Sequence, residues 1–256
     1  MKAFSAYLLF VVLVSCTLHG CKEETPSTTE VTFVDQFYGN TTDLQLFVGY
    51  EEGAVPYTTF QGKSSWDITH KNLGKLLAGR NIVINTPREL SDMTALGILE
   101  QNNYTRQNII DISAELQKRD NQGPSKGITL LFLDGYFIKD GQANELILGV
   151  NLDQTSTIAI FKPVIESSGS GQTTRTLVEQ TTVVHEIGHA LGLVNNGVRA
   201  TSAHHDVQHG AHCTNEDCVM YWQNGGAEIS QFIQPLLLGQ DLDFFGDQCI
   251  ADVTNK

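Results

Sequence analysis

Short runs of apolar residues predict several β-strands along this chain. Polar and apolar residues alternate over the first run, as on a half-buried strand, and the later runs are short and mostly apolar. The expected strands are Asp43–Tyr50, Asn81–Asn85, Leu146–Asn151 and Ser156–Phe161. A longer and almost wholly apolar run, Gly127–Phe137, predicts a buried strand at the centre of a sheet.

Apolar residues with helical spacing predict three helices among these strands. The expected helices are Ser65–Leu77, Thr105–Lys118 and a segment from about Thr173 to Leu191. The order of the elements predicts an α/β (α+β) fold, in which a twisted mixed sheet is backed by helices.

The N-terminus has the features of an export signal. Lys2 supplies a positive charge, and the apolar run within Ala6–Leu18 is too short for a stable membrane span. Cys16 and Cys21 are candidate lipid-attachment sites, and Cys21-Lys22-Glu23-Glu24 resembles the export signal of surface lipoproteins in Bacteroidetes-type bacteria. We therefore expect a lipoprotein of the bacterial cell envelope, at the outer membrane or cell surface, attached through Cys21. Simple cleavage and secretion is the alternative.

Length and charge set the outline of the protein. The chain has 256 residues, and we expect a signal peptide at 1–20, a flexible tether at 21–40 and one folded domain at 41–256. A net charge of −13 argues against nucleic acid as a partner. We expect a monomer that meets the membrane only through its N-terminal lipid anchor.

The segment Val183–Gly192 contains two histidines with the spacing of a metal site. His185 and His189 are four residues apart, so a helix places both imidazoles on one face, where they can reach one Zn²⁺. Glu186 would then lie beside the metal and act as the general base, and Gly192 suits a left-handed helix end. The simpler interpretation is two ordinary histidines on a partly buried helix.

A catalytic zinc ion needs a third protein ligand, with the fourth position left for water. Candidate ligands are dense in the segment that follows Gly192. They are His204, His205, Asp206, His209 and His212. Their spacing alone leaves the choice among them open.

The helix motif and the turn beyond it resemble the metzincin metallopeptidases. His185-Glu186-x-x-His189-x-x-Gly192 matches the start of the metzincin motif, but Asn195 stands where that family has its third ligand. Further on, His212-Cys213-x-x-x-x-Cys218-Val219-Met220 resembles the turn of the archaemetzincin group. An insertion of about sixteen residues before His212 reconciles the two spacings.

This resemblance implies a fold and several residue roles. The fold would be a metzincin-like two-lobed zincin, with a large N-terminal lobe at about 41–192 and a small C-terminal lobe at about 193–256. His212 would be the third zinc ligand, with His209 and His205 as alternatives, and Met220 would be the turn methionine. Ser156–Phe161 would be the edge strand that pairs with an extended peptide. Tyr221, beside the turn, is expected to pack rather than to contact substrate.

Three cysteines follow the signal segment: Cys213, Cys218 and Cys249. In an oxidising compartment we expect two of them to form a disulfide, and the sequence does not choose the pair. In archaemetzincins two further cysteines complete a second zinc site. Only Cys249 is present here, so a four-cysteine site is excluded. A second, structural ion held by His204, Asp206 and His209 is a further possibility.

The sequence therefore predicts a zinc-dependent metalloendopeptidase that acts on proteins or peptides, with His185, His189 and His212 as zinc ligands and Glu186 as the general base. Two alternatives stay open. One is a surface-binding lipoprotein with a structural zinc ion, and the other is a zinc amidase that acts on cell-wall material. The preferred cleavage sequence cannot be inferred, because no motif marks the loops that form specificity pockets.

Overall fold

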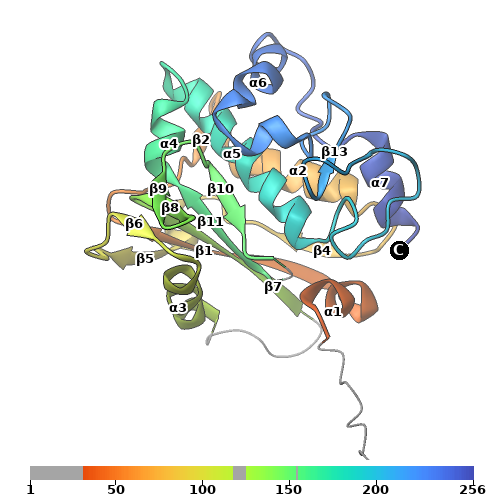
Figure 1. The fold of residues 1–256 in the computed structure, drawn as a ribbon, viewed down its shortest axis with the longest axis horizontal. Coiled ribbons are helices and arrows are strands. Elements are labelled where there is room, and N and C mark those ends of the chain that lie inside the picture. The colour runs from red at the N-terminus through yellow and green to blue at the C-terminus, as the bar shows by residue number, and fades with distance from the viewer. Residues whose placement is uncertain (1–30, 118–124, 154) are drawn as a thin grey trace, which may run out of the picture. The chain divides into compact units, whose positions relative to one another are not determined.

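A mixed sheet of six strands runs through the centre of the molecule (Figure 1). Its strands are β1 (Asp43–Glu51), β4 (Val83–Asn85), β5 (Thr94–Gly97), β7 (Ser125–Leu133), β10 (Gly149–Asn151) and β11 (Thr157–Phe161). Along the sheet the order is β10-β11-β7-β1-β4, and β5 also pairs with β1. The pairs are parallel except for the antiparallel pair of β10 and β11. The predicted α/β class is therefore confirmed.

Coordinates come from a computed structural model that describes residues 31–117, 125–153 and 155–256. The expected signal peptide, both candidate lipidation cysteines and the first part of the expected tether lie outside these residues. Val31–Lys256 forms one compact unit. None of the helices within the described residues is long and apolar enough to cross a membrane.

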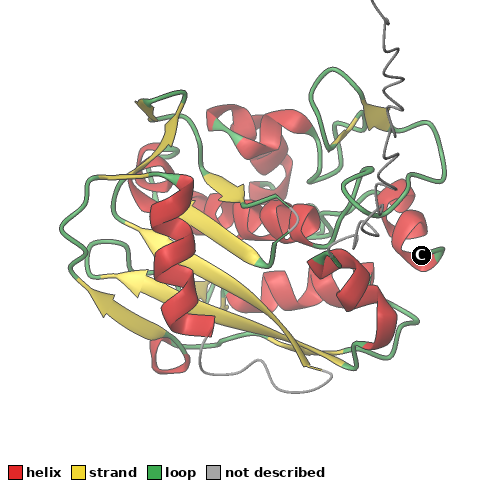
Figure 2. Cartoon of the chain, turned by 60° about the horizontal axis from the view of Figure 1, so that its bottom comes forward, coloured by secondary structure: helices red, strands yellow, loops and turns green. Residues whose placement is uncertain are grey.

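Helices cover both faces of the sheet. Within the described residues the α-helices are α1 (Phe33–Asn40), α2 (Trp66–Leu76), α3 (Arg106–Gln117), α4 (Lys162–Ser167), α5 (Gln172–Ala190), α6 (Ser230–Leu237) and α7 (Asp247–Thr254). The helices α2 and α5 lie on one face and α3 lies on the other, as Figures 1 and 2 show together. The three predicted helices, now α2, α3 and α5, are confirmed to within one or two residues at each end.

Smaller sheets and short 3₁₀ helices surround this centre. The strands are β2 (Thr59–Phe60) with β3 (Lys63–Ser64), β6 (Asn103–Tyr104) with β8 (Tyr136–Lys139) and β9 (Gln142–Asn144), and β12 (His205–Asp206) with β13 (His212–Cys213). The 3₁₀ helices are Leu90–Asp92, Trp222–Gly225 and Ala227–Ile229. The β12–β13 hairpin closes the inserted segment and brings His212 back toward α5.

The structure corrects three expectations about local structure. The apolar run Gly127–Phe137 is not one strand, because β7 ends at Leu133 and β8 begins at Tyr136. The run Ser156–Phe161 is not the sheet edge, because β11 lies between β7 and β10. Part of the expected tether is helix α1, whose Val34 and Phe37 are buried.

The segments before and after Gly192 share one hydrophobic core. The cluster of buried side chains includes Leu44 and Phe132 from the sheet as well as Phe244 and Cys249 from the C-terminal segment. The expected smaller C-terminal lobe is therefore packed directly onto the face of the sheet that α2 and α5 cover.

Helix α5 is the central helix of this face. All of its residues from Thr176 to Gly188 are buried, because α5 packs against the sheet, α2 and the C-terminal segment together. The chain leaves the helix at Gly192, whose φ of +82° is the left-handed conformation expected there. A Cβ atom at this glycine would also lie 2.9 Å from Val34 Cγ1. Helix α1 therefore packs directly against the end of α5.

Candidate metal centre

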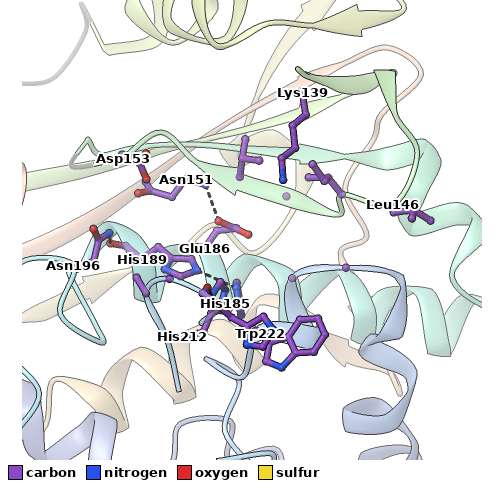
Figure 3. A pocket seen from close by; sticks show the side chains of 18 of the residues that line it. Lys139, Leu146, Asn151, Asp153, His185, Glu186, His189, Asn196, His212 and Trp222 are labelled. Atoms are coloured by element: carbon purple, nitrogen blue, oxygen red, sulfur yellow. Dashed lines mark hydrogen bonds between the residues drawn. The ribbon is translucent and has the colours of Figure 1, made fainter. Parts of the chain in front are cut away.

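The last turns of α5 carry His185, Glu186 and His189 to the wall of a cleft (Figure 3). His212 reaches the same point from β13. Each of the three histidines offers one ring nitrogen, and these nitrogens all lie within 4.8 Å of one another. The structure thus brings together the four residues that the sequence assigned to the zinc site.

The distances between the ring nitrogens suit a zinc ion. His185 Nε2 and His189 Nε2 are 3.1 Å apart. Zinc–nitrogen bonds of about 2.0–2.1 Å in a tetrahedral site place two ligand nitrogens about 3.4 Å apart. Small adjustments of the side chains would therefore accommodate the ion.

Backbone carbonyls fix the orientation of two of the rings. His185 Nδ1 donates to Val219 O at 2.7 Å, and His212 Nδ1 donates to His209 O at 2.6 Å. In a neutral imidazole the other nitrogen, Nε2, then keeps its lone pair. Such outer hydrogen bonds are typical of metal-binding histidines.

Burial keeps the imidazoles neutral. Desolvation and, to a smaller extent, the nearby His212 lower the pKa of His185 to about 3. The pKa of His189 is held well below its usual value by burial and by both neighbouring histidines. Burial also lowers the pKa of His212. All three rings are therefore in the form that binds metal at neutral pH.

Glu186 is held by the edge strand of the sheet. The backbone N–H of Asn151, at the end of β10, donates to Glu186 Oε2 at 2.6 Å. Gly149 makes room for this contact, because a Cβ atom there would lie 3.0 Å from Glu186 Cγ. Burial raises the pKa of Glu186 to about 8, against the opposing effect of the Asn151 N–H.

Met220 packs against Gly188, which lies between the two helix histidines in the sequence. A Cβ atom on Gly188 would be 2.4 Å from Met220 Sδ, so the methionine side chain packs where a larger residue would stand. Met220 is fully buried. Its position agrees with the role that the resemblance implies for the turn methionine.

The other histidines of the inserted segment have different partners. His205 contacts the side chain of Asn195 at 3.0 Å and Gly210 O at 2.8 Å. His209 donates to Asp206 Oδ2 at 2.7 Å and stacks on the Trp222 ring at 4.1 Å. Neither joins the ring nitrogens of the three-histidine group.

His204 is buried elsewhere, beside Asp252 and Cys213. The expected set of His204, Asp206 and His209 is therefore not brought together. The three cysteines do not form the expected disulfide either, because all three are free thiols in the structure.

A cavity of about 600 Å³ opens above the three histidines. Its lining includes Glu186, Gly149, Lys139 and Trp222. Lys139 reaches in from the β8–β9 hairpin, on the side opposite Trp222 (Figure 3). Among the described residues, Tyr221 does not line this cavity.

Sequence reasoning missed the groups that position Glu186 and the histidines. Asn151 acts through its backbone N–H, which has no sequence signature. The roles of Gly149 and Gly188 depend on close approach of side chains from other elements, Glu186 and Met220. For Gly188 alone, the sequence offered a clue, because this glycine lies inside the motif between His185 and His189.

Comparisons with known proteins find one similar solved structure and no similar sequence. No family model matches the chain, and no curated protein matches its sequence. The chain is similar to the crystal structure of a zinc-dependent peptidase from Methanocorpusculum labreanum (strain Z), with a TM-score of 0.43 and 11% sequence identity. The similarity covers 81% of this chain and 99% of that chain.

Proposed function

We propose that this protein is a zinc-dependent endopeptidase. One observation carries the proposal: three imidazoles converge at the wall of an open cleft, and Glu186 lines the cleft next to them. A purely structural zinc site is closed by four protein ligands, whereas a catalytic site has three and keeps one position open. The described residues offer three histidine nitrogens here, which favours the catalytic interpretation.

The chain's own residues supply the remaining chemistry. A zinc ion held by His185, His189 and His212 would act as a Lewis acid toward water and the substrate carbonyl. Burial alone raises the pKa of Glu186 to about 8, but a zinc cation beside it would lower this pKa and favour the carboxylate. Glu186 would then remove a proton from the attacking water and pass it to the departing amide nitrogen. The hydrogen bond from Asn151 N–H holds Glu186 Oε2 at the strand where substrate would lie.

The edge strand β10 favours an extended peptide as substrate. Leu148 O and Leu152 N pair with β11, so the backbone groups of Gly149 and Asn151, which alternate with them, face away from β11. Gly149 and Asn151 also line the cavity. Asn151 N–H is taken by Glu186, so an extended peptide would pair with the backbone groups of Gly149 and with Asn151 O as an added strand, which is a common mode of peptide recognition.

The cellular setting of this activity rests on the N-terminal sequence. We propose that the protein is a monomeric lipoprotein of the bacterial cell envelope, anchored at the outer membrane or cell surface through Cys21. Its substrates would then be extracytoplasmic proteins or peptides. Surface labelling of cells that express the Cys21→Ala variant would test the anchor, since loss of the lipid should release the protein.

Activity measurements on the zinc-loaded mature protein test the proposed reaction. Glu186→Gln should keep normal zinc content but lower peptide hydrolysis by at least about a hundredfold, the usual effect of losing a general base. Glu228→Gln, at an exposed position away from the cleft, is the matched control and should remain fully active. Unchanged hydrolysis by Glu186→Gln would contradict the role of this residue.

A substrate panel separates the proposal from the two alternatives. Casein and gelatin should be cut, and a chelator should stop the reaction. Cleavage of muropeptides alone would instead indicate a cell-wall amidase. Turnover of neither substrate class by fully zinc-loaded protein would favour a surface-binding protein with a structural ion.

A further inference from the structure

A second group of metal-binding side chains lies beneath the inserted segment. It consists of His204, Cys213, Cys218 and Cys249, all of which are fully buried. They come from the inserted loop, from the two ends of the turn that leads to Met220, and from helix α7. The three cysteines are free thiols, so a nitrogen and three sulfurs meet in the interior with no disulfide to account for them.

Three ligand atoms of this group, from His204, Cys213 and Cys249, lie within 4.8 Å of one another, and Cys218 lies next to Cys249. Cys218 Sγ and Cys249 Sγ are 3.6 Å apart, and His204 Nδ1 is 3.2 Å from Cys213 Sγ and 4.0 Å from Cys249 Sγ. Bonds of about 2.3 Å to sulfur and about 2.0 Å to nitrogen predict edges of about 3.8 Å and 3.6 Å. A disulfide would require its two sulfurs to be only about 2.05 Å apart.

A buried carboxylate orients the histidine toward the sulfurs. His204 Nε2 lies 2.7 Å from Asp252 Oδ2, and both side chains are fully buried. The other carboxylate oxygen accepts hydrogen bonds from the backbone N–H and the hydroxyl of Thr201, both at 2.7 Å. With Nε2 occupied in this way, His204 Nδ1 faces Cys213 and Cys249. A carboxylate behind a histidine is the usual outer layer of a protein zinc site.

Two of the sulfurs receive backbone hydrogen bonds that would stabilise thiolates. The N–H of Gly246 donates to Cys218 Sγ at 3.2 Å, and the N–H of Asn215 donates to Cys213 Sγ at 3.4 Å. Thiolate is the form of cysteine that binds metal. These two backbone N–H groups favour the thiolate form of Cys218 and Cys213, and the Asp252 carboxylate orients His204 for metal binding.

We propose that His204, Cys213, Cys218 and Cys249 bind a second, structural zinc ion. His204, Cys213 and Cys249 are already gathered, and a small shift of the Cys218 side chain, 3.6 Å from Cys249 Sγ, would add the fourth ligand. Four protein ligands would close the coordination shell and leave no position for water or substrate. The ion would join the inserted loop to helix α7 and fix the segment between them. Cys213 directly follows His212, and its backbone N–H donates to Met220 O at 2.8 Å. The second ion would thus hold in place the third imidazole of the first site and the turn methionine.

Metal content tests this proposal independently of any peptidase activity. The mature protein, purified with zinc and without reductant, should contain two zinc ions per chain by elemental mass spectrometry. His212→Ala should lose the first ion and keep the second, whereas Cys249→Ser should lose the second. Ser202→Ala, an exposed change in the same loop, is the control and should keep both.

Cobalt substitution identifies the ligands directly. Cobalt bound to thiolates gives an intense near-ultraviolet charge-transfer band, so cobalt-loaded His212→Ala should show this band and Cys249→Ser should show it weakened or lost. If Cys249→Ser does not fold, Asp252→Asn keeps all four ligands and should weaken binding of the second zinc ion by about 10- to 100-fold.

Two results would overturn the second site. One is a single zinc ion per chain with no thiolate band in the cobalt-loaded His212→Ala variant. The other is a disulfide between any two of the three cysteines in the zinc-loaded protein, detected by mass spectrometry of peptides from the unreduced chain. Because neither measurement uses hydrolysis, an inactive protein with two ions would contradict the peptidase proposal alone.

Discussion

Single buried contacts place the reactive groups of α5. Six residues before His185, Glu179 on the same helix is fully buried and forms an ion pair with Lys162 at the start of α4. Glu179 Oε1 also accepts the backbone N–H of Tyr57 at 2.8 Å, and the Lys162 ammonium lies 3.5 Å from the centre of the Tyr57 ring. One carboxylate therefore joins three separate segments next to the candidate metal centre.

Glu179→Gln should destabilise the fold, because the buried Lys162 charge loses its closer partner and keeps only Glu166, at 3.6 Å. The expected loss is about 3–5 kcal/mol in the free energy of unfolding, measured by urea denaturation. The exposed pair of Arg88 and Asp67, 3.2 Å apart, provides the control. Asp67→Asn should cost less than about 1 kcal/mol. Equal losses in the two variants would show that the Glu179 pair is not a buried support of α5.

Gly149 has no side chain, yet it controls the position of the reactive carboxyl group of Glu186. Gly149→Ala places a methyl group against Glu186 Cγ and against Thr182 Cγ2, at 3.0 and 2.9 Å before adjustment. We expect kcat for peptide hydrolysis to fall by about 10- to 100-fold through displacement of Glu186, with zinc content unchanged. Gly39→Ala, where a Cβ atom meets nothing within 4 Å, should leave kcat as it is.

At the scale of elements, helix α5 and the turn beneath it form one packed unit. Gly188 lets Met220 Sδ approach the helix between the two histidines. Val219, in the same turn as Met220, accepts a hydrogen bond from His185 Nδ1 through its backbone carbonyl. The turn thus fixes the position of the helix face that carries the metal ligands and the orientation of the His185 ring.

Gly188→Ala tests this packing. The new methyl group would overlap Met220 Sδ, so we expect a loss of about 1–3 kcal/mol in the free energy of unfolding and weaker zinc binding. Gly74→Ala is the matched change inside helix α2, at an exposed position with nothing near the new methyl group. It should stabilise the protein by about 0.5–1 kcal/mol. A neutral Gly188→Ala in thermal and chemical denaturation would contradict the packing role of Met220.

Elements with a strong local signal were predictable from the sequence, and their neighbours in the sheet were not. Helices α2, α3 and α5 follow from apolar periodicity and from glycine or proline at their ends. The break between β7 and β8 does not, because it depends on Asp134 N–H donating to Glu51 Oε2 at 2.8 Å, a contact with a strand more than eighty residues away. The edge position of β10 likewise depends on strand order, which alternation along one strand does not encode.

At the scale of the whole molecule, the C-terminal segment packs over α2 and α5 and completes the site. Lys71 and Lys75 of α2 pair with Asp243, and Arg80 donates to Val253 O at 3.0 Å. Phe244, next to Asp243, accepts the Val219 N–H at 2.7 Å, so the turn that carries Met220 is tied to contacts that begin in the N-terminal half of the chain. The sequence motifs named His212 and Met220, but the paths that hold them in place appear only in three dimensions.

Metal removal should affect the whole molecule. Ligands that bind only the folded state raise its stability, by about 4 kcal/mol when free zinc is a thousand times the dissociation constant. We therefore expect chelation to lower the melting temperature in calorimetry and to abolish peptide hydrolysis, and zinc in excess should restore both. An unchanged melting temperature after complete zinc removal would show that no metal stabilises the fold.

The central claim is that His185, His189 and His212 bind one zinc ion that keeps a position open toward the cleft beside Glu186. A crystal structure of the zinc-loaded protein, with anomalous data collected at the zinc edge, tests it most directly. We predict an anomalous peak about 2.0–2.1 Å from Nε2 of all three histidines, with water as the fourth ligand next to Glu186. A crystal without that peak, or with a fourth protein ligand closing the shell, would contradict the claim.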